Sequence, residues 1–433
     1  FLKGEQNFTV NSRLHNFKLE QLLERVGIPN AWVRLDLSGE AEIAGKLSGQ
    51  GLHIKLETLI NNFESLDRNF HSPKAEKLLH LKRLRLKGDT YLTKNFIDLN
   101  NINAGLGNNN YQINGTLRFE GNNGFNLRVK SAHANLADIG PIAGLEFLGH
   151  GEIAAALEGP YAGPTISGTL NLNEANIAGY RIGDLRTTII YNQNKLKLER
   201  MHGQRDGGRF SGSININFAV NPSRIGGALN LYDVPSAPLL RDLGINPAHA
   251  KQIHGKLDGM VSVNGALTQP NGFFEANTKR LSLAQINLSE NHIRGGFFDK
   301  NHVLWVNVAK TKRNEPFDFD LNWKYDDTIT FSAKWLNLKS KRFQKLIPNH
   351  KLQGTLSGSL ELGGPFSNIE GDISTQAKGL SVGDIQLKEI NVEIKKKNTS
   401  IDLLANLFET KPNLKLRIKT TKDMPFTLEL QLR

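Results

Sequence analysis

Residues 238–265 read PLLRDLGINPAHAKQIHGKLDGMVSVNG: a short apolar segment with helical spacing, a loop, and a strand of alternating apolar and polar residues between glycines. The same layout recurs in residues 19–45, 137–159 and 341–364. The glycine that opens each strand lies at Gly39, Gly151, Gly259 and Gly358, at intervals of 112, 108 and 99 residues. The chain is therefore a long-period array, in which each β unit needs its neighbours to complete a core.

An alternation of period two, typical of β-strands with one apolar face, dominates the rest of the sequence. Glycine, asparagine and aspartate separate the alternating runs, which predicts antiparallel strands joined by short turns. Four short segments have helical spacing instead: residues 19–26, 139–148, 239–243 and 343–347. In the third of them, Ser236 is expected to cap the helix.

A wide sheet with one apolar face leaves that face in contact with water unless something covers it. Four short helices are too few to do so. The predicted fold is therefore mainly β: an elongated, curled antiparallel sheet, taco-like around a hydrophobic groove, built of quasi-repeats with a few short helices. We expect one continuous β-groove array over residues 1–433, with quasi-repeats at approximately 1–148, 149–254, 255–353 and 354–433.

The residues expected to line the groove are apolar side chains on the inward side of the alternating strands. They are Ile113, Leu117, Phe119, Ile153, Leu157, Ile166, Leu170, Phe210, Ile214, Ile216, Phe218, Phe317, Phe319, Leu321, Trp323, Phe331, Leu428 and Leu430.

Composition limits the classes of partner. The formal net charge is +12, but lysine and arginine mostly occur singly on polar strand sides, and the denser clusters lack the interleaved aromatics that stack on bases. We therefore expect no nucleic acid. There is no cysteine, which excludes disulfides and thiolate metal sites. No stretch approaches the roughly 20 apolar residues that cross a bilayer, so a membrane anchor is expected outside the given sequence.

Catalytic patterns are absent from the sequence. The twelve histidines form no His-Glu-x-x-His motif, there is no Gly-x-Ser-x-Gly elbow, and no glycine-rich stretch ends in the Lys-Ser/Thr of a P-loop. We expect no enzymatic activity, no cofactor and no metal.

Residues 151–218 contain a Gly-Pro turn at Gly159, a Pro-x-x-x-Gly strand start at Pro164, a Lys-Leu-x-Leu strand and a closing Gly-x-x-x-Gly at Gly208. In this order the elements resemble the repeat unit of the AsmA-like superfamily, most closely its TamB-type proteins. The pattern returns at residues 259–323 and 358–420. The N-terminal copy lacks the Gly-Pro turn, and we expect residues 61–77 to form an irregular insertion there.

The resemblance implies a protein in the periplasm of a Gram-negative-type envelope, anchored to the inner membrane. Its groove would bind phospholipid acyl chains and conduct phospholipid between the inner and outer membranes, which supports outer-membrane biogenesis. It further implies partnership with an Omp85-type outer-membrane barrel. The alternative is a structural or adhesive β-array, or an assembly factor for outer-membrane proteins that conducts no lipid.

Overall fold

The structure is a computed structural model of the 433-residue chain. It describes residues 6–25, 33–46, 51–66, 77–119, 124–140, 146–177, 179–242, 251, 253–283, 286–310, 317–346, 351–365, 367–398, 400–406, 414–419 and 427–432.

The described chain is mainly antiparallel β-structure with a few short helices, as the alternation predicted. It divides into two compact units. The N-terminal unit comprises Phe1–Arg205 and Ser211–Arg224, and the C-terminal unit comprises Asp206–Phe210 and Ile225–Arg433. Strand β13 (Gly208–Asn217) is divided between them after Phe210, and further boundaries follow Arg205 and Arg224.

The remaining elements of the N-terminal unit are eleven long or medium strands, one short strand and two short helices. They are β1 (Asn7–Lys18), α1 (Leu19–Arg25), β2 (Val33–Lys46), β3 (Leu52–Leu66), β4 (Lys77–Leu81), β5 (Leu84–Leu92), β6 (Phe96–Leu106), β7 (Asn109–Arg118), β8 (Gly124–Asn135), α2 (Leu136–Ile139), β9 (Phe147–Gly159), β10 (Thr165–Ile177), β11 (Tyr180–Asn192) and β12 (Lys195–Arg205).

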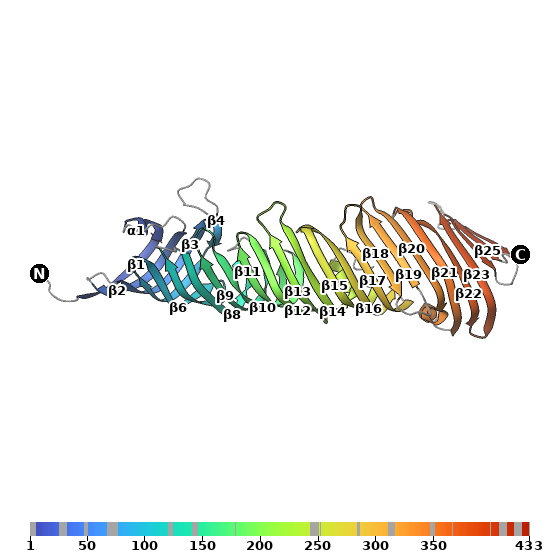
Figure 1. Ribbon diagram of the computed structural model, residues 1–433, viewed down its shortest axis with the longest axis horizontal. Helices are drawn as coiled ribbons and strands as arrows, with labels where there is room; N and C mark the ends of the chain where they lie inside the picture. The colour runs from blue at the N-terminus through green and yellow to red at the C-terminus, as the bar shows by residue number, and fades with distance from the viewer. Residues whose placement is uncertain are drawn as a thin grey trace. The chain divides into compact units, whose positions relative to one another are not determined.

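Strand order in the N-terminal unit follows the chain, with one branch. Antiparallel ladders join β1–β2–β3–β5–β6–β7–β8–β9–β10–β11–β12. The short strand β4 instead pairs with the end of β3. Figure 1 shows the successive strands of this unit side by side in blue and green. Strands that are consecutive in the sequence are joined by short turns, and they therefore pair with each other as antiparallel neighbours.

The C-terminal unit has the same construction. Its elements are β14 (Arg224–Pro235), α3 (Ser236–Asp242), β15 (Ile253–Ala266), β16 (Gln269–Leu283), β17 (Ile286–Phe297), β18 (His302–Lys310), β19 (Phe317–Lys324), β20 (Thr328–Lys339), the 3₁₀ helix η2 (Ser340–Leu346), β21 (Leu352–Pro365), β22 (Glu370–Val382), β23 (Ile385–Lys397), β24 (Ser400–Asn406), β25 (Leu414–Lys419) and β26 (Thr427–Leu432). Antiparallel ladders join β15 to β26 in chain order.

The recurring sequence phrase corresponds to a helix followed by a long strand: α1 and β2, α2 and β9, α3 and β15, η2 and β21. Its anchor residues need to be glycine because the next strand lies against them. At Gly39, Gly151, Gly259 and Gly358, an added Cβ would lie within 3.0 Å of that strand's backbone. The four glycines therefore mark equivalent places of close strand approach.

Bends within the strands come from bulges at non-glycine residues. Five residues with positive φ, near +50°, each donate a backbone N–H to a polar side chain of the next strand. The pairs are Asn16 with Ser38 (3.0 Å), Asn101 with Asn114 (2.8 Å), Glu174 with Asp184 (3.4 Å), Asp233 with Asp258 (2.8 Å) and Asn337 with Ser357 (3.0 Å). Because a bulge increases twist and bends its strand, this repeated device curls the sheets.

The surface area shows that much of the chain is exposed. The accessible surface is 25884 Å², whereas two separate compact proteins of half this mass would together expose about 20,000 Å².

Three local expectations are corrected. Residues 61–66 are not irregular, because they extend β3, and Lys77 begins β4; residues 67–76 lie outside the described part. Ser236 is the first residue of α3 rather than the residue before it, and its hydroxyl donates to the Ile253 carbonyl oxygen (2.9 Å). The second helical segment starts earlier than expected, at Leu136, and β9 begins at Phe147.

Candidate functional site

An unbroken row of small and apolar residues crosses the sheet of the C-terminal unit. Each member is the direct cross-strand partner of the next, over twelve neighbouring strands. The row is Gly259, Ala276, Ile293, Val308, Phe319, Ala333, Leu360, Ile373, Ile394, Leu403, Leu416 and Leu430. We call it the C-terminal apolar row. Since direct partners share one face, it defines a continuous apolar face.

The chain covers this face only in part. Val308 is 1% exposed, but Phe319, Leu360, Ile373 and Ile394 are half-buried. A row of half-buried apolar side chains is unfavourable in water, because each side chain keeps part of its apolar surface exposed to solvent. The face is therefore suited to an apolar ligand.

Part of this face forms an apolar cleft beneath α3. Its lining includes Leu239 and Leu240 of α3 and, from the strands, Leu257, Ile293, Leu304 and Phe319. The polar side chain in the lining, Ser236, uses its hydroxyl to hold the start of α3 to Ile253. The cavity volume is about 190 Å³, below the 300–1,000 Å³ common for pockets that enclose compact ligands. The cleft fits a slim apolar chain better than a compact molecule.

The N-terminal unit has a corresponding row across β1 to β12, which we call the N-terminal apolar row. Its members are Val10, Ile43, Ile54, Thr90, Leu99, Gly115, Leu127, Leu157, Ile166, Tyr191 and Leu196. Leu127, Leu157 and Ile166 are half-buried, while Tyr191 and Leu196 are buried. This face is therefore open in the middle and packed near β12.

The structure brings most of the predicted lining residues of the N-terminal unit to one face. Register and alternation place six of them together: Ile113, Leu117, Ile153, Leu157, Ile166 and Leu170. Ile153 and Leu170 are buried, and the other four are half-buried. Phe119, which directly follows β7, is also buried.

The predicted residues of β13 are more enclosed. Phe210, Ile214 and Ile216 are 8%, 9% and 3% exposed, and Phe218, just after the strand, is half-buried. Their side chains are better described as packed than as open to a ligand.

In the C-terminal unit the prediction located one wall of the cleft. Phe317, Phe319, Leu321 and Trp323 share one face of β19, and Phe331 is the partner of Leu321. Phe319 and Leu321 line the cleft. Leu428 and Leu430 lie in β26, but their side chains are outside the described part.

Sequence reasoning missed the other walls of the cleft. Leu239 and Leu240 were recognised as helical but were assigned to no site, and Leu257, Leu281 and Leu304 were not singled out. One signal in the sequence could have indicated the wall formed by Leu239 and Leu240: a helix precedes the glycine-containing strand in each copy of the repeated phrase.

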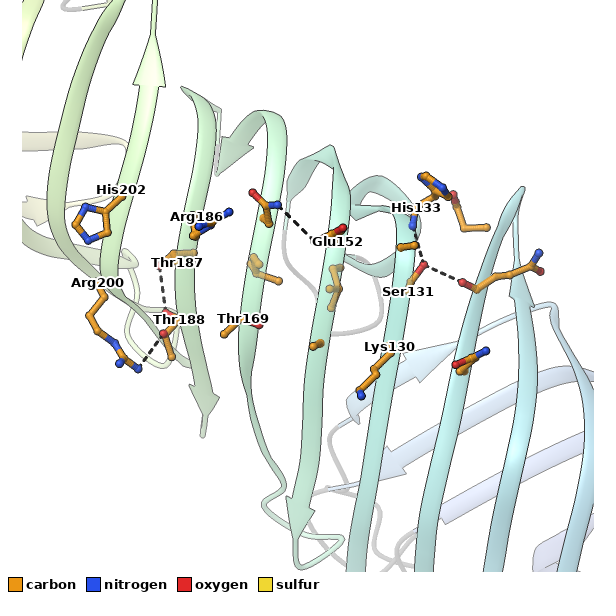
Figure 2. Close-up of a pocket in the computed structure, with 18 of the residues that line it drawn as sticks. Lys130, Ser131, His133, Glu152, Thr169, Arg186, Thr187, Thr188, Arg200 and His202 are labelled. Atoms are coloured by element: carbon orange, nitrogen blue, oxygen red, sulfur yellow. Dashed lines mark hydrogen bonds between the residues drawn. The ribbon is translucent and has the colours of Figure 1, made fainter.

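The opposite face of the N-terminal unit is polar and also concave (Figure 2). Its cavity of about 1100 Å³ spans β6 to β12, and Glu152, Asn171, Arg186 and His202 form a cross-strand row in it. These four side chains are exposed, and Asn171 donates to Glu152 (3.5 Å). These exposed polar side chains are those expected on the solvent-facing side of a sheet, so we assign no binding site to this surface.

Two further features are absent from the described residues. No group of three or more histidine, cysteine, aspartate or glutamate residues is arranged to hold a metal ion. No helix in the same residues has the length and apolar character needed to cross a membrane.

Comparison of the chain with family models, with curated proteins and with solved structures found no match.

Proposed function

We propose that this chain is a non-enzymatic lipid-groove protein, which binds phospholipid acyl chains along the inner apolar faces of its sheets and lets them move along those faces. The observation that carries the proposal is the C-terminal apolar row, with its half-buried members and the apolar cleft beside it. A face that only stabilised the fold would be expected to be covered throughout.

Binding in such a groove is non-directional. Each buried methylene contributes about 0.8 kcal/mol, so a long acyl chain gains affinity from many equivalent contacts. The described cleft lining offers few hydrogen-bonding groups that would fix one position of the chain. Similar sites in series favour sliding over tight retention.

The setting of this activity follows the sequence resemblance. On this proposal the protein works in the periplasm, anchored to the inner membrane by a segment outside the given sequence, and conducts phospholipid toward the outer membrane. An Omp85-type barrel is the partner that the resemblance implies.

A structural β-array is the second candidate, and one observation favours it. Inward residues near β12 are fully packed: Leu185, Leu196, Leu198 and Met201 are each at most 2% exposed. An array with such a core throughout would bind no lipid.

Lipid analysis of the purified chain separates the two candidates. We expect phospholipid to co-purify with the wild-type chain and with Asp318→Arg, whose charge lies on the exposed polar face of β19. Phe319→Arg places a charge in the C-terminal apolar row, which costs several kcal/mol in an apolar environment, and should lower the amount of bound lipid relative to both other proteins. Secondary structure measured by circular dichroism controls for folding. Absence of lipid from all three proteins would favour the structural array.

A further inference from the structure

Strand β3 belongs to two ladders in succession. Residues Leu52–Ile60 pair with β5, and residues Phe63–Leu66 pair with β4. An extra residue, Asn61, interrupts the register with β2 between these two parts. The β3–β4 hairpin, defined here as Phe63–Leu66 and Lys77–Leu81, therefore leaves the ladder that continues through β5.

The end of this hairpin meets a distant turn of the same unit. Ser65 Oγ donates a hydrogen bond to the Tyr161 carbonyl oxygen at 2.9 Å, although the two residues are 96 positions apart. Tyr161 lies between β9 and β10, five strands along the ladder from β3, which is about 24 Å along a sheet. The sheet must curl over its own face to bring them together.

The face that it covers is the apolar one. Ser65 pairs with Val33, which shares the alternation of β2 with Ile43 of the N-terminal apolar row. The ring of Tyr161 packs edge-on against Phe125, with 4.8 Å between ring centroids and an interplanar angle of 87°. Phe125 is two residues from Leu127 and therefore on the same face of β8. The Ser65–Tyr161 contact thus joins the end of β3 to the turn after β9 across the apolar face.

The contact is also buried. Ser65, Leu66 and Leu79 of the hairpin are 0%, 2% and 4% exposed, and Tyr161 and Phe125 are 4% and 5% exposed. Leu127 and Leu157, which lie next to this contact on the same face, are half-buried, so the groove beside the contact has room for an acyl chain. At the contact, side chains of the protein itself therefore fill the groove where an acyl chain would otherwise lie.

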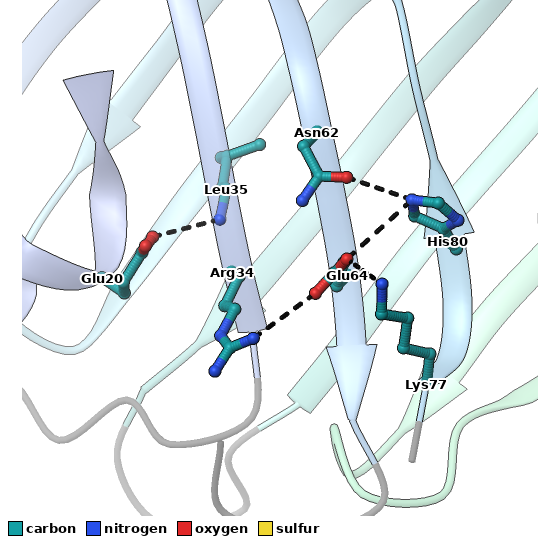
Figure 3. A network of polar contacts seen from close by, with 7 residues as sticks. All are labelled: Glu20, Arg34, Leu35, Asn62, Glu64, Lys77 and His80. Carbon is teal, nitrogen blue, oxygen red and sulfur yellow. Dashed lines mark hydrogen bonds and ion pairs between the residues drawn. The ribbon is translucent and has the colours of Figure 1, made fainter. Parts of the chain in front are cut away.

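A polar network on the other side of the hairpin holds its two strands together (Figure 3). Glu64 Oε1 lies 2.5 Å from Lys77 Nζ and 3.9 Å from His80, while Glu64 Oε2 lies 3.7 Å from Arg34 of β2. Burial alone would raise the pKa of Glu64, but hydrogen bonds from Lys77 and Asn62 outweigh it and lower that pKa. The carboxylate stays ionised and ties the hairpin to β2.

We propose that the β3–β4 hairpin is a strap that closes the groove of the N-terminal unit, so that acyl chains enter this stretch only when the Ser65–Tyr161 contact opens. The inference rests on the proposed lipid-binding function and deepens it. The polar network keeps the hairpin intact as a unit, whereas the contact made by Ser65 is one hydrogen bond plus apolar packing, which can separate and reform.

The absence of cysteine from the chain allows a direct test. Ser65→Cys and Ala162→Cys place the only two thiols on either side of the contact, where a short bifunctional thiol reagent bridges them. A photo-crosslinking residue at Leu157 reports lipid in the N-terminal groove, and one at Leu321 reports lipid in the cleft of the C-terminal unit. The matched control is the same protein treated with a monofunctional thiol reagent.

We expect bridging to lower lipid capture at Leu157 at least tenfold and to leave capture at Leu321 unchanged. Equal capture at Leu157 in bridged and control proteins would overturn the strap, as would failure of the thiols to be bridged in the folded chain. Lipid capture at neither position, even in the control, would instead refute the proposed function. As an independent variant, Tyr161→Ala should raise capture at Leu157 several-fold, and an unchanged or lower value contradicts the proposal.

Discussion

The backbone N–H of Asp233 donates a hydrogen bond to the Asp258 carboxylate at 2.8 Å, from a residue whose φ is +52°. Lys279 Nζ, on the following strand, lies 2.5 Å from Asp258 and 3.1 Å from Asp233. Three successive strands, β14, β15 and β16, are thereby joined at one left-handed residue. The same kind of link, from a left-handed backbone amide to a side chain of the next strand, recurs in the N-terminal unit and again at Asn337.

Replacing Asp258 tests whether this link stabilises the left-handed conformation of Asp233. We expect Asp258→Ala to lower the free energy of unfolding by about 1–2 kcal/mol, because the Asp233 N–H loses its acceptor. Hydrogen exchange of peptides from β14 and β15 should show the loss locally. Asp318→Ala is the matched control, since Asp318 is an exposed carboxylate on a strand of the same unit, and should change stability by less than about 0.5 kcal/mol. Equal effects of the two substitutions would contradict the role of the link.

The same carboxylate predicts a pH dependence. Hydrogen bonds from Lys279 and from the Asp233 N–H lower the pKa of Asp258 below its ordinary value of 3.8. Its contribution to stability is therefore complete above the unfolded-state pKa and is lost as the pH falls through the lower folded-state pKa. The stability difference between wild type and Asp258→Asn should be largest above about pH 4 and should shrink on further acidification. Denaturant titrations of both proteins at neutral and acidic pH measure it, and a difference that grows below pH 4 would refute the assignment.

The anchor glycines are expected to be intolerant of a side chain. Gly259→Ala would place a Cβ against the Glu275 carbonyl oxygen and the Ala276 backbone, so the two strands must separate. We expect a loss of about 1–3 kcal/mol, as for other overpacked sites. Gly363→Ala is the control, because a Cβ there would meet only the Ile329 carbonyl oxygen, at 3.8 Å. Urea unfolding monitored by circular dichroism compares the two variants, and equal stabilities would show that close strand approach does not explain the repeat.

The fold class could be predicted from the sequence because alternation and turn residues are local signals. The repeated phrase likewise located the helices that precede β2, β15 and β21, while the helix before β9 lies earlier than expected. The bulges could not be predicted, since Asn101 or Asn337 in an alternating run looks like any polar strand residue. Each bulge changes the register by one, and therefore which side chains share a face beyond it.

The candidate site was predicted less completely for the same reason. Phe319 and Leu321 were identified as inward, but their partners Val308 and Val306 could be found only once the register was known. An irregular insertion was predicted over residues 61–77, which include the first strand of the β3–β4 hairpin, and Asn61 and Asn62 do interrupt the alternation of β3. The contact between Ser65 and Tyr161 depends on curling of the sheet, for which the sequence carries no local signal.

The most direct test of a lipid groove compares two neighbouring positions of β19 that differ only in the face they occupy. A photo-crosslinking residue at Leu321, in the lining of the apolar cleft, should capture phospholipid in the cell envelope; one at Asp320, exposed on the polar face, should not. Mass spectrometry of the crosslinked protein identifies the captured molecule. Capture at Leu321 at least tenfold above that at Asp320 is the predicted result, and equal capture from both faces, or none from Leu321 in a folded chain, contradicts the account.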